Sequence, residues 1–407
     1  MHIAFVTPEY PLNNSEVGGL GTYTRKTALE LYKRGHKVSV FLESNRDKVS
    51  SDNGVTIYEV KCPSLYYGLN SKSILRQLTR VMYVLYSAFK IKLKVLQIHK
   101  RYKIDIVQSP NYLAPGYFLK KNSKVPIVSR VSSYAPLYHS AYGLPRTFGD
   151  YLIDYLELQQ VVTADASFSP SHFMQKVYSR YENCNLDFIP TPVEINKYVK
   201  NNTTVSKAIS SKISLNQYLL YFGSLSRIKG VDLMSDIINI IAPKYPNLNF
   251  IFAGKDYGLP NNEPVARYVL RNCPSYRKRI LFLPYQKHSV LYPLIKHSIG
   301  VVIPSRVDNY PNTCLEAQSL GIPVIGTTDS SLDELIINNK TGFIAENSSS
   351  IDIAKKIEKL LKLSKKERLE MKKNIGKNML AIQNEDRIKL LINYYEKVIK
   401  THKEQTS

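Results

Sequence analysis

Short, almost continuous apolar runs alternate along the chain with longer stretches whose apolar residues recur every three to four positions. The run His2–Thr7 and the run Tyr218–Phe222 are nearly free of charged residues. Such runs are typical of strands whose two faces are both covered, as in parallel sheets. The stretches between them have the period of amphipathic helices. This alternation predicts an α/β, doubly wound fold.

The same pattern sets the expected elements. Further strands are expected at 38–42, 55–60, 104–108, 126–131, 166–169, 187–189, 249–253, 280–283, 299–303 and 323–325. Helices are expected from Tyr23 to Gly35, at 73–99, 146–162 and 231–241, and from 351 to the end of the chain.

The strand–glycine loop–helix scheme begins twice, once at the N-terminus and once after a polar stretch at 198–212 that is typical of a linker. We therefore expect an N-terminal Rossmann-like domain over residues 1–200 and a C-terminal Rossmann-like domain over 201–380. The last segment, 381–407, is expected to be a helix that packs back on the N-terminal domain. The ligand is expected between the domains, at the carboxyl ends of the strands.

Composition adds a strong charge bias. The 407 residues include 56 Lys and Arg against 33 Asp and Glu, a formal net charge of +23. This charge favours polyanionic partners such as nucleic acid, an anionic membrane surface or phosphorylated small molecules, without choosing between them. The four cysteines lie far apart with no CxxC spacing, which predicts free thiols in a reducing compartment. We expect no signal peptide and no transmembrane helix, and hence a cytoplasmic protein.

The first candidate motif is the glycine pair Gly18-Gly19, which follows the first strand and opens a helix. Glycine permits close approach of the backbone to a phosphate, and a helix N-terminus offers free N–H groups. A tight turn without a ligand explains the pair equally well. The absence of GxGxxG argues against a dehydrogenase.

A second candidate motif lies between the strand Tyr218–Phe222 and the next helix. Ser224, Arg227, Lys229 and Gly230 lie in this loop, where the two cations would stand over an anion. Two solvated charges are the alternative interpretation. The loop is not a P-loop, because GxxxxGK[ST] is absent.

The third motif follows the strand at 299–303 and is the most informative. Asp308 is expected in a loop, Asn312 and Thr313 at the start of a helix that they cap, and Glu316 one turn further on. Two carboxylates at this spacing would bind hydroxyl groups of one ligand. Each carboxylate taken alone is also compatible with a solvated side chain.

Together these motifs resemble the family-4 glycosyltransferases. The family signature is a Glu, seven residues and a second Glu, followed by Ala-x-x-x-Gly-x-Pro-Val. Here it reads Asp308, seven residues, Glu316-Ala317, then Gly321-x-Pro323-Val324, in addition to Lys229-Gly230 and Gly18-Gly19. The resemblance implies the GT-B fold, with two Rossmann-like domains facing across a cleft, and a retaining, metal-independent transfer from a nucleoside diphosphate sugar. It implies that the domain at 1–200 binds the acceptor and that the domain at 201–380 binds the nucleotide sugar.

The resemblance also implies roles. Asp308, Lys229 and Glu316 would be the catalytic residues: Asp308 beside the transferred sugar, Lys229 on the diphosphate and Glu316 on the ribose. The base would lie near Gly254 and Pro284. The donor-binding residues implied in this way are Gly18, Gly19, Ser224, Arg227, Lys229, Gly254, Pro284, Asp308, Asn312, Thr313 and Glu316. No cofactor or metal ion is expected.

Four positions depart from the family pattern, and one of them is Pro192, where a Gly is common. Ser224 stands where a diphosphate-binding Arg is common, and we expect Arg227 to replace it. Asp308 is one methylene shorter than the usual Glu. Ser132 occupies the position of a frequent His, and with Tyr134 and His139 it is assigned to the acceptor side.

The segment 72–103 carries Lys and Arg but no acidic residue, interleaved with apolar residues. It is either a basic amphipathic helix on an anionic membrane surface or a helix packing on the N-terminal sheet with a solvated basic face. The membrane interpretation suits a glycan or lipid-linked acceptor in cell-surface polysaccharide synthesis.

The leading functional prediction is therefore a hexosyltransferase. The alternatives are a GT-B-fold sugar-nucleotide epimerase and a basic nucleic-acid-binding protein. The absence of a recognition-helix, RRM or zinc-finger signature argues against nucleic acid as a partner.

Overall fold

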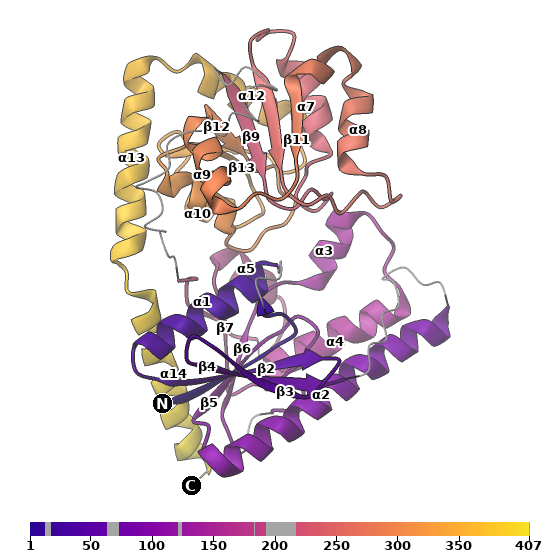
Figure 1. Cartoon of the computed structure of the whole chain (residues 1–407), viewed down its shortest axis with the longest axis vertical. Coiled ribbons are helices and arrows are strands. Elements are labelled where there is room, and N and C mark those ends of the chain that lie inside the picture. The colour runs from indigo at the N-terminus through magenta and orange to yellow at the C-terminus, as the bar shows by residue number, and fades with distance from the viewer. Residues whose placement is uncertain (13–17, 63–72, 121–123, 183, 193–216, 407) are drawn as a thin grey trace. The chain divides into compact units, whose positions relative to one another are not determined.

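The computed structural model describes residues 1–12, 18–62, 73–120, 124–182, 184–192 and 217–406 (Figure 1). The chain divides into two compact units. Unit 1 consists of Met1–His139, Pro145–Pro192 and Asp386–Ser407, and unit 2 of Ser140–Leu144 and Val193–Glu385. The polar stretch at 198–212, predicted as a linker, lies outside the described residues.

Unit 1 contains an eight-stranded sheet in the order β3-β4-β2-β1-β5-β6-β7-β8. All neighbours are parallel except the edge pair β3 and β4. The strands are β1 (His2–Thr7), β2 (Lys37–Ser44), β3 (Lys48–Asp52), β4 (Val55–Lys61), β5 (Ile106–Pro110), β6 (Ile127–Arg130), β7 (Ala166–Ser169) and β8 (Asp187–Phe188).

Strand β1 shows why this sheet needs helices on both faces. Its side chains alternate, so Ile3 and Phe5 pack against one helix layer, and Ala4 and Val6 pack against the other. The first layer is formed by α1 (Gly19–Lys33) and α14 (Arg387–Thr406), and the second by α2 (Ile74–Tyr102). The remaining helices of this part of the chain are α3 (Ala135–Tyr142), α4 (Phe148–Thr163) and α5 (His172–Tyr178).

The C-terminal helix α14 is fastened to the unit 1 sheet by polar contacts as well as by its apolar face. The hydroxyl of Tyr395 donates to the side-chain oxygen of Gln108 at 2.6 Å. The ring of His402 lies 2.7 Å from the carboxylate of Asp165. The C-terminal helix thus completes the core of unit 1, which otherwise consists of Met1–His139 and Pro145–Pro192.

Unit 2 contains a six-stranded, all-parallel sheet in the order β11-β10-β9-β12-β13-β14. Its strands are β9 (Tyr218–Phe222), β10 (Asn249–Ala253), β11 (Ile280–Leu283), β12 (Gly300–Val302), β13 (Val324–Thr327) and β14 (Gly342–Ala345). Its helices are α7 (Leu233–Ile241), α8 (Val265–Asn272), η3 (Pro274–Arg279), α9 (His288–His297), α10 (Asn312–Ser319), α11 (Leu332–Leu335), α12 (Ser350–Lys362) and α13 (Lys365–Asn384). Two parallel-dominated α/β sheets confirm the predicted fold class.

The described helices include none that is both long and apolar enough to cross a membrane. The four cysteines are free and buried.

Candidate active site

β9 and β12 are neighbours in the unit 2 sheet. The strands that follow β9 in the chain are added on one side of this pair, and those that follow β12 are added on the other, so the strand order reverses here. Loops that leave such neighbouring strands diverge, and ligands of doubly wound folds bind at this point, outside the carboxyl ends of the strands. Here the two loops are 223–232 and 303–311. They contain most of the residues that the sequence motifs single out.

The two loops touch so closely that one position excludes any side chain. Gly230 has a φ of +67°, and a Cβ there would lie 1.8 Å from the carbonyl oxygen of Pro304. The backbone N–H of Arg306 donates to the carbonyl of Ile228 at 2.9 Å. The glycine after Lys229 is therefore required by backbone packing, and it holds Lys229 beside the second loop.

Lys229 and Asp308 form an ion pair across these loops, with Nζ to Oδ2 at 2.8 Å. The carboxylate also accepts a hydrogen bond from the Ser305 hydroxyl at 3.0 Å and one from the backbone N–H of Asn309 at 3.1 Å. Asp308 is buried, with 5% of its surface exposed. It is therefore not the solvated side chain that the sequence also allowed.

A second ion pair, between Arg306 and Asp232, joins the same two loops. Arg306 donates to both carboxylate oxygens of Asp232, at 2.7 and 3.0 Å, and to the carbonyl of Arg227 at 2.6 Å. Arg227 itself donates to the carbonyl of Tyr142 at 3.0 Å and lies 3.8 Å from Asp232. The structure thus gives the guanidinium of Arg227 protein partners. Its predicted replacement of the family's diphosphate-binding Arg stays a prediction.

Helix α10 begins beside this ion pair. Its N-cap is Pro311, and none of the described side chains caps it. The prediction that Asn312 and Thr313 cap the helix is wrong: both are already helical residues, because proline at 311 fixes the extended backbone that precedes the first turn. Their N–H groups belong to the first turn, where helical partners are lacking.

Glu316 lies on the next turn of α10 and is partly exposed. Its Oε1 lies 3.8 Å from Nε2 of His288, the first residue of α9. The ring of His288 stacks on Tyr292 with centroids 4.8 Å apart. The sequence analysis did not identify His288, because this histidine lies in a polar segment of the sequence and belongs to no recognisable motif. Only the position of α9 next to α10 brings it to Glu316.

The other predicted donor-binding residues of unit 2 also lie at the carboxyl edge of the sheet. Gly254 follows β10 directly, and a Cβ there would lie 1.7 Å from the carbonyl oxygen of Gly223. Ser224 is exposed, and its carbonyl accepts a bond from the Tyr221 hydroxyl at 2.6 Å. Pro284 is exposed and follows β11. Six predicted positions from four loops therefore share one edge with Lys229 and Asp308: Ser224, Gly254, Pro284, Asn312, Thr313 and Glu316.

In unit 1 the corresponding reversal lies between β1 and β5. Gly18 is the N-cap of α1 and Gly19 its first residue, as predicted, and none of the described side chains caps this helix. Among the residues that the structure describes, and apart from its chain neighbours and the nearby backbone of α1, no atom lies within 4 Å of a Cβ built on Gly19. This helix N-terminus is thus exposed and suited to an anion.

Ser132 and Tyr134, assigned to the acceptor side, lie in the loop after β6. The buried side chain of Asn111, which follows β5, organises that loop: its oxygen accepts from the N–H of Ser132 at 2.7 Å, and its nitrogen donates to the carbonyl of Ser133 at 2.7 Å. The hydroxyl of Tyr134 bonds that of Tyr181, and burial together with this bond raises the pKa of Tyr134 to about 12. Sequence reasoning missed Asn111.

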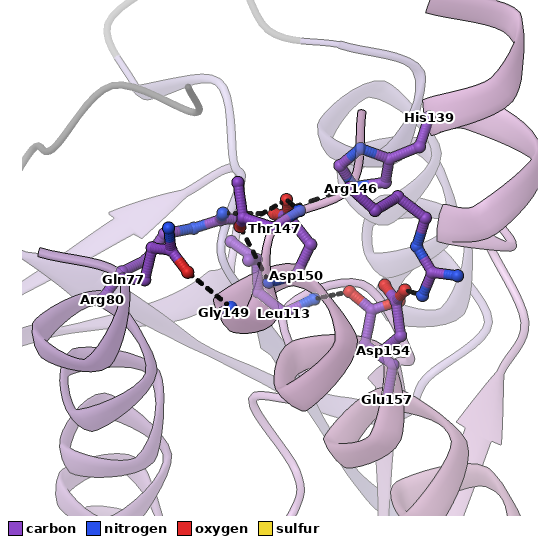
Figure 2. Close-up of polar contacts among 10 residues, drawn as sticks. All are labelled: Gln77, Arg80, Leu113, His139, Arg146, Thr147, Gly149, Asp150, Asp154 and Glu157. Carbon is purple, nitrogen blue, oxygen red and sulfur yellow. Dashed lines mark hydrogen bonds and ion pairs between the residues drawn. The ribbon is translucent and has the colours of Figure 1, made fainter. Parts of the chain in front are cut away.

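His139 lies in a different environment, at the polar junction of α3 with α4 (Figure 2). Its Nε2 is 3.8 Å from Asp150. Burial, together with the nearby Arg146 and Arg80, lowers the pKa of His139 against the opposing effect of Asp150. The structure therefore separates His139 from Ser132 and Tyr134: His139 contacts the start of α4, whereas Ser132 bonds Asn111 and Tyr134 bonds Tyr181.

Known proteins of the same class match this architecture. The family model described as Glycosyltransferase Family 4 matches residues 17–197, and the model described as Glycosyl transferases group 1 matches residues 204–378. The chain therefore belongs to the group 1, family-4 glycosyltransferases of the GT-B fold.

Among curated relatives, the uncharacterized glycosyltransferase MJ1178 of Methanocaldococcus jannaschii is 24% identical over 79% of this chain and 92% of its own. The D-inositol 3-phosphate glycosyltransferase of Mycobacteroides abscessus is 22% identical over 85% of this chain and 77% of its own.

Solved structures share the fold at low identity. Sucrose-phosphate synthase from Thermosynechococcus elongatus superposes with a TM-score of 0.74 at 16% identity, covering 98% of this chain and 100% of that one. An E. coli structure described as trehalose-6-phosphate with bound UDP-2-fluoro glucose has a TM-score of 0.71 at 12% identity, covering 97% and 98%.

Proposed function

We propose that this glycosyltransferase moves a hexose from a nucleoside diphosphate sugar to a glycan or lipid-linked acceptor, with retention at the anomeric carbon. The observation that carries the proposal is the ion pair of the half-buried Lys229 with the buried carboxylate of Asp308, at the reversal point of the unit 2 sheet. The uncapped first turn of α10 lies in the same loop system. The cation and the N–H groups suit the diphosphate of a sugar nucleotide, and the carboxylate suits the hydroxyl groups of its sugar.

The chemistry follows from charge. When the glycosidic bond breaks, negative charge develops on the departing diphosphate. The ammonium of Lys229 carries three protons, so it bonds a phosphate oxygen while it keeps Asp308. Together with the N–H groups of α10 it stabilises this charge without a metal ion.

The two carboxylates take the hydroxyl groups of the donor. Asp308, held by Ser305 and Asn309, is oriented by its neighbours and accepts from the transferred sugar. Glu316, one turn into α10, accepts from the ribose. The base lies beside Gly254 and Pro284.

We further propose that the enzyme works in the cytoplasm at the inner face of the cell membrane, in cell-surface polysaccharide synthesis. A polymer built there on a lipid carrier would explain the charge of +23.

The test is release of nucleoside diphosphate from a panel of sugar nucleotides, with membrane extract as acceptor, and with mass spectrometry and anomeric NMR of the product. We expect release with one donor, an α-linked product from an α-linked donor, and no loss of rate with chelator. Asp308→Asn should lose transfer, whereas Asp333→Asn, on α11, should keep it.

Other outcomes would contradict the proposal. An intact but epimerised donor would favour an epimerase. Binding to nucleic acid without any donor turnover would favour a nucleic-acid-binding protein. An inverted product, or activity restored to the chelated enzyme by magnesium, would refute the retaining or the metal-free mechanism.

A further inference from the structure

The guanidinium of Arg130, the last residue of β6, is a buried charge. Arg130 is 6% exposed, and within the ranges that the structure describes its side chain forms no ion pair with a carboxylate. Burial lowers the pKa of Arg130, yet arginine keeps its charge in proteins. Because a buried charge without a countercharge lowers the free energy of unfolding, Arg130 is a poor choice for stability alone.

Three neutral groups contact this guanidinium, and each belongs to a different part of unit 1. The ring of Tyr23, on α1, has its centroid 3.8 Å from Cζ. One terminal nitrogen donates to the hydroxyl oxygen of Ser132 at 2.9 Å, and the other donates to that of Thr191 at 3.2 Å. Nε is buried and has no hydrogen-bond partner among the described residues. Arg130 thus joins α1, the loop after β6 and the segment after β8 through one planar group.

On the α1 side, the guanidinium acts through Tyr23. Tyr23 follows Gly19 by four residues, so its Cα lies about 6 Å further along the helix axis. The Tyr23 hydroxyl accepts a hydrogen bond from Nε2 of Gln108 at 3.3 Å, and the side-chain oxygen of Gln108 accepts one from Tyr395. The ring is therefore held on its face by Arg130 and at its hydroxyl by Gln108. This fixes the direction in which the uncapped first turn of α1 points.

On the side of the loop after β6, the guanidinium acts through Ser132. The backbone N–H of Ser132 donates to Asn111 at 2.7 Å, so Asn111 fixes the backbone of this loop. The hydroxyl oxygen of Ser132 accepts from Arg130, so its own proton is directed away from the guanidinium. Arg130 therefore orients a side chain whose backbone is already fixed. Ser132 is one of the residues that the sequence analysis assigns to the acceptor side.

Another arginine of the chain shows how a purely structural guanidinium is bound. Arg279, in unit 2, donates to the backbone carbonyls of Ala242 at 2.9 Å, Tyr245 at 2.8 Å and Pro246 at 2.9 Å. These acceptors all belong to the end of α7 and the turn that follows it, and none is a residue of the candidate site. Arg130 differs because two of the elements that it joins contain predicted substrate-binding residues.

We propose that Arg130 is a positioning residue for both substrates of the transfer. Its guanidinium aligns the first turn of α1, as the binding site of the donor diphosphate, with the Ser132 hydroxyl on the acceptor side. The inference rests on the proposed function, because it concerns the alignment of a donor with an acceptor. It also explains the uncompensated charge, since a planar fork of donors reaches all three elements at once and a neutral side chain offers fewer donors.

The experiment compares Arg130→Met with the wild-type full chain. Hydrogen–deuterium exchange should become faster at residues 18–24 and 131–134 and stay unchanged in unit 2, because both segments lose the group that joins them. Nucleoside diphosphate release, from the sugar nucleotide that the wild type uses and with membrane extract as acceptor, should show kcat/KM lowered about 10²-fold. The melting temperature should change little, because loss of an uncompensated buried charge offsets loss of the bonds to Ser132 and Thr191.

Further variants separate positioning from charge and from stability. Arg130→Lys keeps the charge but not the planar fork, so its kcat/KM should fall as in Arg130→Met. In a Ser132→Ala background, Arg130→Met should cost less than it does in the wild type, because the two residues act through one hydrogen bond. Arg279→Met, the matched control, should lower the melting temperature and leave kcat and KM unchanged.

Three outcomes would overturn this role. Arg130→Met exchanges like the wild type at both segments, or it exchanges faster there and keeps its kcat/KM. In the third, Arg130→Lys retains wild-type kinetics, which would assign the effect to charge alone. If Arg130→Met does not fold, Arg130→Lys replaces it in both measurements. A wild type that releases nucleoside diphosphate from none of the donors would refute the proposed function, while the exchange comparison would still decide whether Arg130 holds the two segments.

Discussion

The two sheets have the same plan but different chemistry at their reversal points. Counting only parallel strands in chain order, the unit 2 sheet reads 3-2-1-4-5-6, and the unit 1 sheet has the same order with a seventh strand, β8, added at its edge. In unit 2 the reversal holds a charged pair, Lys229 and Asp308, supported by a second pair, Arg306 and Asp232. In unit 1 it holds the uncapped glycine start of α1 and the neutral amide of Asn111.

The fold provides a ligand-binding position in each unit, and the side chains at that position determine its chemistry. Charge stabilisation is assigned to unit 2, where a fixed ammonium stands at the sheet edge. Unit 1 offers backbone N–H groups and space at Gly19. Substitution of the charged pair in unit 2 should therefore lower kcat, whereas substitution of Gly19 in unit 1 should change how the donor is positioned.

The largest effect is expected for Lys229→Ala. Loss of the ammonium removes charge stabilisation that grows in the transition state, so kcat should fall by about 10²–10³ with a smaller change in donor affinity. Steady-state kinetics with varied donor measure both. Lys255→Ala, in the loop after β10, is the matched control and should keep kcat. An unchanged kcat in Lys229→Ala would remove the charged pair from the reaction.

The next contrast is between two glycines. Gly254→Ala places a Cβ 1.7 Å from the carbonyl oxygen of Gly223, so it should destabilise unit 2 by about 3 kcal/mol. Gly19→Ala meets no atom within 4 Å, so its melting temperature should equal that of the wild type while donor turnover falls. Thermal unfolding and nucleotide release separate the two effects. Full activity in Gly19→Ala would argue against a diphosphate at α1.

The sequence predicted the positions of most strands, but it did not predict the contacts between side chains that are distant in the chain. β9 and β10 lie at the expected residues, because both are apolar runs bounded by glycine or polar residues. It missed β3 and β14: β3 is a polar edge strand defined by its pairing with β4, and β14 is a short run with a half-exposed residue. It also missed α3, a short segment.

In the candidate active site, too, the sequence predicted local features and missed the long-range ones. Lys229, Asp308 and Glu316 were found through motif spacing, which is local. Three contacts of the site join residues that are far apart in the chain. They are the ion pair of Lys229 with Asp308, the contact of Glu316 with His288, and the hydrogen bonds of Asn111 to loop 131–134. Such contacts depend on strand order and register, which no local pattern contains.

A smaller effect on chemistry is expected for Glu316→Gln. If the carboxylate accepts bonds from the ribose, its loss should weaken donor binding about tenfold, since bonds to a charged group contribute about 1.5–3 kcal/mol. Calorimetry with the donor measures this. The variant His288→Gln should keep most of the affinity, because His288 contacts the carboxylate and not the ligand. Wild-type affinity in Glu316→Gln would place the ribose elsewhere.

The smallest effect concerns unit 1 and its stability alone. Glu157 on α4 is buried, and its carboxylate accepts the backbone N–H of Leu113 at 2.9 Å, in the loop after β5. Burial raises the pKa of Glu157 to about 8, against the opposing effects of that bond and of Arg80. The unfolded chain loses the proton near the ordinary value of 4.5, whereas the folded chain keeps it up to about 8.

Between these two values the folded state therefore binds more protons, and its free energy of unfolding falls as the pH rises. The contribution is complete below pH 4.5 and is lost above pH 8. Glu157→Gln keeps an oxygen for Leu113 but cannot ionise, so its melting temperature should not show this decline, and at pH 8 it should exceed the wild type by a few degrees. Melting curves from pH 5 to 8 measure the difference, with the exposed Glu370→Gln as control. A decline of equal slope in Glu157→Gln would show that the loop after β5 is not held by a protonated carboxyl group.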